Sequence, residues 1–277
     1  MLKFSDNNKM SMLLVLLGIV LAACHDKPEP AEQNRQAEKV VKPVTNPDVL
    51  PYLNERDVLL PLTDVGCKKR SCEHMELQSL ETVDQALNQH IEAWLAMILQ
   101  DLLGEEHKSL SLHEALRQYV QKSNHWQAEF ALNQPYQLDL SMKIAYQRNQ
   151  YVLLQSIVNA KQEELRIEDR GYFSVFDRKQ KKPLQLVDIL ADPQLKNFES
   201  ILQAEYQKWL KEQSKEVKLL APKSLNWKQQ EWFFDGQGIG LHYQANQIAK
   251  GAKQLDIFLS PAQTKQLLRP AVYQKMF

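Results

Sequence analysis

The sequence predicts an α+β fold, in which an antiparallel sheet carries helices packed on one face. Apolar residues alternate between positions 138 and 155, which indicates two long strands joined by a polar turn. An apolar stripe at spacings of three and four between positions 83 and 102 indicates an amphipathic helix. Strands and helices follow one another without the regular βαβ rhythm of a parallel sheet, so a doubly wound fold fits less well.

The amino terminus begins with an export signal. Lys3 and Lys9 lie in a short polar start, and residues 10–23 form an apolar run. This run is short for a membrane span, which needs roughly 20 residues. Residues 1–23 are therefore expected to be a signal peptide. An uncleaved anchor, or a plain signal followed by a chance cysteine, are the alternatives.

Residues 21–24, Leu-Ala-Ala-Cys, resemble the lipobox of bacterial lipoproteins. The resemblance implies that the signal is cut before Cys24, whose thiol takes a diacylglyceryl group and whose new amine is acylated by a fatty acid such as palmitate. This lipid anchors the chain firmly, since each buried methylene contributes ~0.8 kcal/mol. His25 follows the cysteine, which favours the outer membrane, facing the periplasm, although Asp26 leaves the inner membrane open.

Residues 24–50 read as a disordered tether. They contain prolines at 28, 30, 43 and 47 and hardly any large apolar residue. Such a segment buries too little surface to offset the entropy of ordering it. The folded domain is expected to begin at residue 51 and to run to 277, with parts 51–165 and 166–277 belonging to one unit.

Cys67 and Cys72 flank a short basic loop. An exported protein meets an oxidising compartment, so the two cysteines are expected to form a disulfide. A metal or redox pair is the alternative, with His74 as the only nearby imidazole.

Local signals predict the helices. Thr82 is expected to cap the first helix, which Gly104 ends, and Ser111 with Glu114 form a capping box for the second. A later helix is expected to open at Asp192, as cap, followed by proline in its first turn.

Further strands are predicted towards the carboxyl end. Residues 171–176 form a short strand, and residues 231–243 form a hairpin about an Asp-Gly turn. Leu255, Ile257 and Leu259 alternate in a last strand, and Ser260 caps a helix after it.

Composition and motifs exclude several function classes. Thirty-four basic residues balance thirty-four acidic ones, so the charge does not favour a nucleic-acid partner. The seven histidines form no ligand spacing, the glycines at 236, 238 and 240 belong to a hairpin, and no nucleophile motif occurs. We therefore predict no catalytic residue, no metal site and no cofactor apart from the lipid on Cys24.

Two groups of side chains are candidates for partner binding. Trp232, Phe233 and Phe234 cluster near a turn, where they serve either to bind sugar or protein or to fill the core. Arg178, Lys181 and Lys182 form a basic hairpin tip that either contacts anionic envelope polymers or is simply solvated.

The second half resembles the exported carboxyl-terminal domain of RsiV-type anti-sigma factors. The resemblance is carried in order by residues 173–177, 181–190, the helix from Leu195, and residues 232–243, 246–251 and 255–260. It implies an envelope-facing recognition domain, because the anti-sigma member binds lysozyme and related deacetylase fusions act on peptidoglycan. Many relatives carry a Gly-Gly-Ala-His motif, where this chain has residues 168–172, Glu-Asp-Arg-Gly-Tyr. A site built on that motif is not carried over.

These observations predict a lipid-anchored, non-catalytic cell-envelope protein of the RsiV-like domain family, with lysozyme or peptidoglycan as candidate ligands. One alternative is an envelope glycan hydrolase or esterase. Another is a structural lipoprotein of an envelope assembly.

Overall fold

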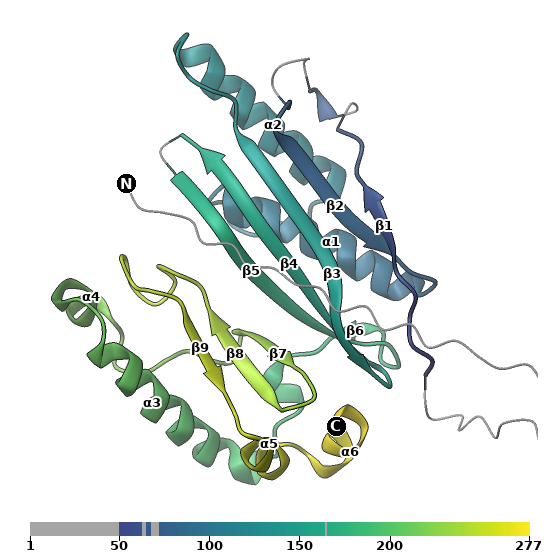
Figure 1. Cartoon of the computed structure of the whole chain (residues 1–277), viewed down its shortest axis with the longest axis vertical. Helices are drawn as coiled ribbons and strands as arrows, with labels where there is room; N and C mark the ends of the chain where they lie inside the picture. Colours follow the sequence, from purple (N-terminus) through teal and green to yellow (C-terminus); the bar gives the residue numbers. More distant parts are fainter. Residues whose placement is uncertain (1–49, 63–64, 68–71, 164) are drawn as a thin grey trace, which may run out of the picture. The chain divides into compact units, whose positions relative to one another are not determined.

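The computed structural model describes residues 50–62, 65–67, 72–163 and 165–277, all within one unit, Thr45–Phe277 (Figure 1). The predicted signal peptide, Cys24 and the predicted tether up to residue 49 lie outside these residues. No helix in the described ranges is long and apolar enough to cross a membrane.

The first sheet has six strands in sequence order, and only its β2–β3 pair is parallel. The predicted hairpin is confirmed as β3 and β4, which are longer than the apolar alternation indicated. The strands are β1 (Arg56–Leu59), β2 (Met75–Glu81), β3 (Gln137–Arg148), β4 (Tyr151–Gln162), β5 (Leu165–Asp177) and β6 (Lys182–Pro183).

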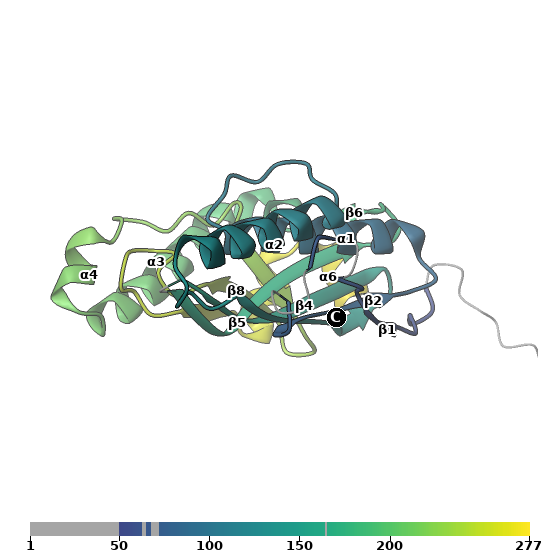
Figure 2. The same cartoon turned by 90° about the horizontal axis from the view of Figure 1, so that it is seen from above.

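Helices α1 (Gln85–Leu102) and α2 (Leu112–Glu129) lie over one face of this sheet, as Figure 2 shows. Their apolar stripes pack on alternate residues of the strands in one core. The capping box of Ser111 and Glu114 is confirmed. The predicted cap of α1 is wrong by two residues, because Asp84 accepts from the backbone N–H of Leu87, while Thr82 accepts from the N–H of Asp84.

A second, three-stranded antiparallel sheet is formed by β7 (Glu231–Phe234), β8 (Ile239–Tyr243) and β9 (Leu255–Phe258). The sequence predicted its strands but not their separation from the first sheet. This sheet shares a second core with α3 (Leu195–Lys211), α5 (Pro261–Leu267) and α6 (Pro270–Met276). The short helix α4 (Lys215–Leu220) follows α3.

The entry to α3 differs from the prediction. Asp192 does not cap an α-helix but begins a 3₁₀ turn, Asp192–Gln194, whose cap is Ala191. Helix α3 follows directly at Leu195. A second 3₁₀ turn, Leu186–Asp188, precedes it. Ser260 caps α5 as predicted, with Pro261 in the first turn. The α+β class is confirmed.

Strand β5 is much longer than the predicted short strand at 171–176. It begins at Leu165 because its charged first half pairs with β4 as well. The expected division between residues 165 and 166 therefore falls inside a single strand. Near its end β5 also pairs with β6, through Phe176 and Asp177.

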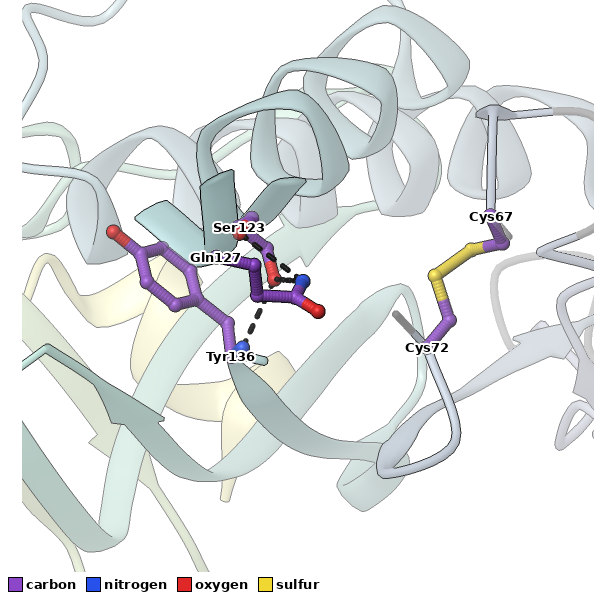
Figure 3. The surroundings of a disulfide bond; sticks show 5 residues. All are labelled: Cys67, Cys72, Ser123, Gln127 and Tyr136. Atoms are coloured by element: carbon purple, nitrogen blue, oxygen red, sulfur yellow. Dashed lines mark hydrogen bonds between the residues drawn. A yellow bond between two sulfur atoms is a disulfide. The ribbon is translucent and has the colours of Figure 1, made fainter. Parts of the chain in front are cut away.

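Cys67 and Cys72 form a disulfide whose Cα atoms lie 5.7 Å apart (Figure 3). Both cysteines pack against the core under α1 and α2. In the same region Ser123 of α2 accepts, through its hydroxyl, from the backbone N–H of Tyr136 at 2.9 Å. The disulfide closes a short loop immediately before β2.

Replacing both cysteines, Cys67→Ser with Cys72→Ser, is expected to lower the free energy of unfolding by about 2 kcal/mol, because a short closed loop restricts the unfolded chain. Urea unfolding followed by circular dichroism measures this. Wild-type protein under reducing conditions is the control and should match the variant. Equal stability of the oxidised wild type and the variant would contradict the prediction.

Candidate functional site

A cleft of about 730 Å³ is bounded by residues from several helices and strands. Its walls come from α1, from β5, from the segment entering β7, and from the loop after β8. All four segments belong to one unit of the chain. Concave sites with a few convergent polar groups are the usual places for ligand binding, so this cleft is the candidate functional site.

One stripe of α1 forms the first wall. His90, Trp94, Met97 and Asp101 follow one another at spacings of four, three and four, which places them on one face of the helix. Trp94 is buried beneath the cleft, whereas Met97 and Asp101 are partly exposed to it. The stripe therefore offers apolar surface between two polar ends.

Strand β5 forms the second wall through Arg170 and residues 172–175. Arg170, Tyr172 and Ser174 are alternate residues, which places them on the face of β5 towards α1. The Tyr172 hydroxyl donates to Asp101 at 2.6 Å, and Arg170 lies 3.8 Å from the same carboxylate. Burial, together with the neighbouring Asp101 charge, raises the pKa of Tyr172. Tyr172 thus stays a neutral donor, and Arg170 balances the charge of Asp101.

His90 joins the two walls. Its Nε2 shares a hydrogen bond of 2.8 Å with the Ser174 hydroxyl, and its ring stacks on Phe176. Burial lowers the pKa of His90 to about 4. The imidazole is therefore neutral at physiological pH and adds no charge to the cleft.

Glu231, the first residue of β7, is a carboxyl group of the cleft whose pKa is raised well above its ordinary value. Its carboxyl accepts from the backbone N–H of Phe173 at 3.2 Å. Burial is the largest cause that raises the pKa of Glu231 to about 8, and the Asp101 charge raises it further, while Arg170 opposes the shift. Glu231 therefore holds a proton near neutral pH.

The register of the small sheet places Glu231 beside a histidine–aspartate pair. Glu231 lies opposite His242, and His242 lies opposite Asp256, so the three side chains form a row on one face. His242 Nδ1 lies 2.6 Å from Asp256. Burial alone would raise the pKa of Asp256, but hydrogen bonds from His242 and Gln254 outweigh it and hold that pKa low.

The remaining rim of the cleft is rich in side-chain amides, which both donate and accept hydrogen bonds. Gln230 donates to the backbone carbonyl of His242, and Gln247 donates to Gln230. Gln229 is exposed at the edge of the cleft. The amides on the rim are Gln185, Gln229, Gln230, Gln244, Asn246 and Gln247.

The aromatic candidates from the sequence do not act together as a binding surface. Trp232 and Phe234 are 3% and 0% exposed and belong to the second core, since alternate residues of β7 face it. Of these two residues, Trp232 also lines the cleft. Phe233 faces the other way and packs on Phe173 and Phe258. Its ring also covers Gly240, where a Cβ atom would collide with it.

The basic candidates are divided as well. Arg178 is tied into the fold, because it pairs with Asp84 at 3.3 Å and donates to the carbonyl of Pro51. It is therefore not available as a contact for envelope polymers. Lys181, in the turn before β6, and Lys182, the first residue of β6, are both exposed and lie outside the cleft.

Sequence reasoning missed the residues that the cleft brings together. His90 and Asp101 are polar residues outside the apolar stripe predicted for the first helix, and Glu231 was assigned only to a hairpin. A usable signal was present in β5, where Arg170, Tyr172 and Ser174 alternate as polar residues on one face. The part of the chain that the structure describes contains no group of three His, Cys, Asp or Glu side chains placed to hold a metal.

Comparison with solved structures shows the same fold in DUF3298 proteins. One, from Pseudomonas aeruginosa PAO1, matches with a TM-score of 0.53 and 17% identity, over 81% of this chain and 96% of its own. Another, from Bacteroides fragilis NCTC 9343, matches with a TM-score of 0.54 and 12% identity, over 82% and 98%. The fold is DUF3298-like. No family model matches the sequence, and no curated protein does.

Glu231→Gln is expected to change how stability depends on pH. The folded DUF3298-like domain keeps a proton on Glu231 that the unfolded chain releases above the ordinary carboxyl range, so wild-type stability falls as the pH rises towards about 8. The Glu231→Gln variant does not lose stability in this way, because its amide does not titrate. Its melting temperature should exceed that of wild type by a margin that grows between about pH 5 and pH 8.

Thermal unfolding by circular dichroism across this range measures the margin. Glu212→Gln, at an exposed position after α3, is the matched control and should show no such trend. A margin for Glu231→Gln that is constant with pH would contradict the protonation of Glu231.

Proposed function

We propose that this chain is a lipid-anchored, non-catalytic cell-envelope protein that binds an envelope glycan, with peptidoglycan as the candidate, in the cleft between α1 and β7. The anchor rests on the lipobox-like Cys24, and the envelope setting rests on the resemblance to RsiV-type exported domains. The outer membrane, facing the periplasm, is the favoured location. The DUF3298-like fold agrees with this resemblance but carries no ligand assignment.

The composition of the cleft is the observation that carries the proposal. Amide side chains surround an apolar floor with aromatic rings, and Arg170 balances Asp101. Sugars present many hydroxyl and amide groups with little charge, and they match walls that donate and accept without a net charge. A protein ligand such as lysozyme would need a broader contact surface than this cleft provides.

Filling the cleft should weaken glycan binding. Met97→Arg places a long charged side chain in the cleft from a partly exposed position on α1, and it should lower retention on purified peptidoglycan by about tenfold or more. Sedimentation with insoluble peptidoglycan measures this. Ala128→Arg, exposed on α2 and outside the cleft, is the matched control and should bind as wild type does.

Lysozyme retention serves as a second arm of the same experiment. If lysozyme is retained and peptidoglycan is not, the ligand is a protein and not a glycan. Retention of neither would overturn the proposed function.

Cys24→Ser should leave the chain without lipid and uncut by the lipoprotein peptidase. Metabolic labelling with a fatty acid, followed by electrophoresis, measures both. Cys67→Ser with Cys72→Ser is the control, since it removes thiols elsewhere and should keep the label. Unchanged labelling of Cys24→Ser would remove the lipid anchor from the proposal.

A second candidate, a glycan hydrolase, is favoured by one observation. The cleft contains two carboxyl groups in different states, a protonated Glu231 and an Asp101 paired with Arg170, and glycoside hydrolases use such pairs as acid and base. Release of reducing sugar from peptidoglycan, lost in Glu231→Gln, would establish this activity. The binding proposal expects no release.

A further inference from the structure

Glu231 is a carboxyl group inside a cleft without a cation of its own. One of its oxygens accepts from Phe173, and no ion pair to Glu231 exists among the described side chains. Arg170, the nearest cation on β5, is paired with Asp101. Glu231 is partly exposed to the cleft and has no cation beside it. Taking such a carboxylate largely out of water is costly, so this geometry favours the neutral acid.

The charged and titratable groups around Glu231 support the same state. Asp101 disfavours a second negative charge, and Arg170 offsets it only in part. His242 is directed to Asp256 through Nδ1 and forms no ion pair with Glu231. The titratable and charged groups that line the cleft with Glu231 are His90 and Asp101 on α1, His107 after α1 and Arg170 on β5. His242 on β8 lies opposite Glu231, and Asp256 on β9 lies opposite His242.

A neutral carboxylic acid has a hydroxyl to donate. Because Phe173 already donates to one oxygen, the acid hydroxyl is left for a partner, and the cleft is where a partner can enter. The best neutral acceptor that a glycan offers is the carbonyl of an N-acetyl group. A free amine on the sugar would instead bring a positive charge into a cleft whose carboxylate is already paired.

We propose that Glu231 donates its hydroxyl to an amide carbonyl of the ligand, so that the cleft selects N-acetylated sugar units over units with a free amine. This inference rests on the proposed glycan-binding function and names the ligand class within it. Glu231 is the residue that sets this specificity, and loss of its proton removes the donor. Binding should therefore weaken as the pH rises above about 8.

Calorimetry with the full-length chain in detergent tests the inference, using the tetramer of N-acetylglucosamine as the probe. The dissociation constant should be level at and below about pH 7 and should rise about tenfold by pH 9. Glu231→Gln keeps a donor that does not titrate, so its dissociation constant at pH 7 should stay within a few-fold of wild type and should be level to pH 9. Glu212→Gln should follow the wild-type profile.

The tetramer of glucosamine, charged at pH 6, is the second probe and should bind wild type at least about tenfold more weakly. Equal affinity for the two tetramers, or a wild-type affinity that is level to pH 9, would overturn the role of Glu231 and leave the glycan proposal standing. Absence of binding to either tetramer and to peptidoglycan at every pH would overturn the glycan proposal itself.

Discussion

The backbone N–H and C=O groups on the free edge of β5 need hydrogen-bond partners, and the groups that pair with them connect the two sheets. Between residues 171 and 175 this strand has β4 on one side only, because β6 pairs just at Phe176 and Asp177. Its outward groups are satisfied from elsewhere in the chain. The carbonyl of Val175 accepts from the N–H of Leu184, the N–H of Phe173 donates to Glu231, and the carbonyl of Gly171 accepts from Gln244. Buried backbone groups rarely stay unpaired, so this edge fixes where β7 and the loop after β8 lie.

Strand β5 contributes side chains to both cores, because successive side chains point to opposite faces of the sheet. Tyr172 and Phe176 face the core under α1 and α2, whereas Val175 belongs to the core of the small sheet. The cleft lies between these two cores, along the edge of β5. Side chains, and not a neighbouring strand, satisfy the backbone groups of that edge. A site of this kind is more rigid than one built on loops alone, since α1, β5 and β7 each hold part of it.

Short-range sequence signals predicted most of the helices and strands, whereas the cleft is assembled by contacts between residues far apart in the chain. The capping box at Ser111, the hairpin about Asp235 and the cap at Ser260 were readable, because each depends on residues close in the chain. The length of β5 was not, because its charged first half forms a strand only by pairing with β4. The surroundings of Glu231 depend on a hydrogen bond from Phe173, 58 positions away, and on the strand register that places His242 opposite it. Sequence periodicity predicts neither contact.

Glu231 costs the fold stability, and this cost supports the proposed role of Glu231 in ligand binding. An apolar residue at this position would avoid burying a carboxyl, and a backbone N–H such as that of Phe173 can be satisfied by a neutral amide. Natural proteins break local rules of burial mainly at functional sites, at some loss of stability. The neighbouring segment 168–172 stands where the RsiV-type domains that the sequence resembles carry a Gly-Gly-Ala-His motif, and it contributes Arg170 and Tyr172 to the same cleft. Arg170, Tyr172 and the carboxyl of Glu231 thus line one cleft, which agrees with the proposal that this cleft binds a ligand.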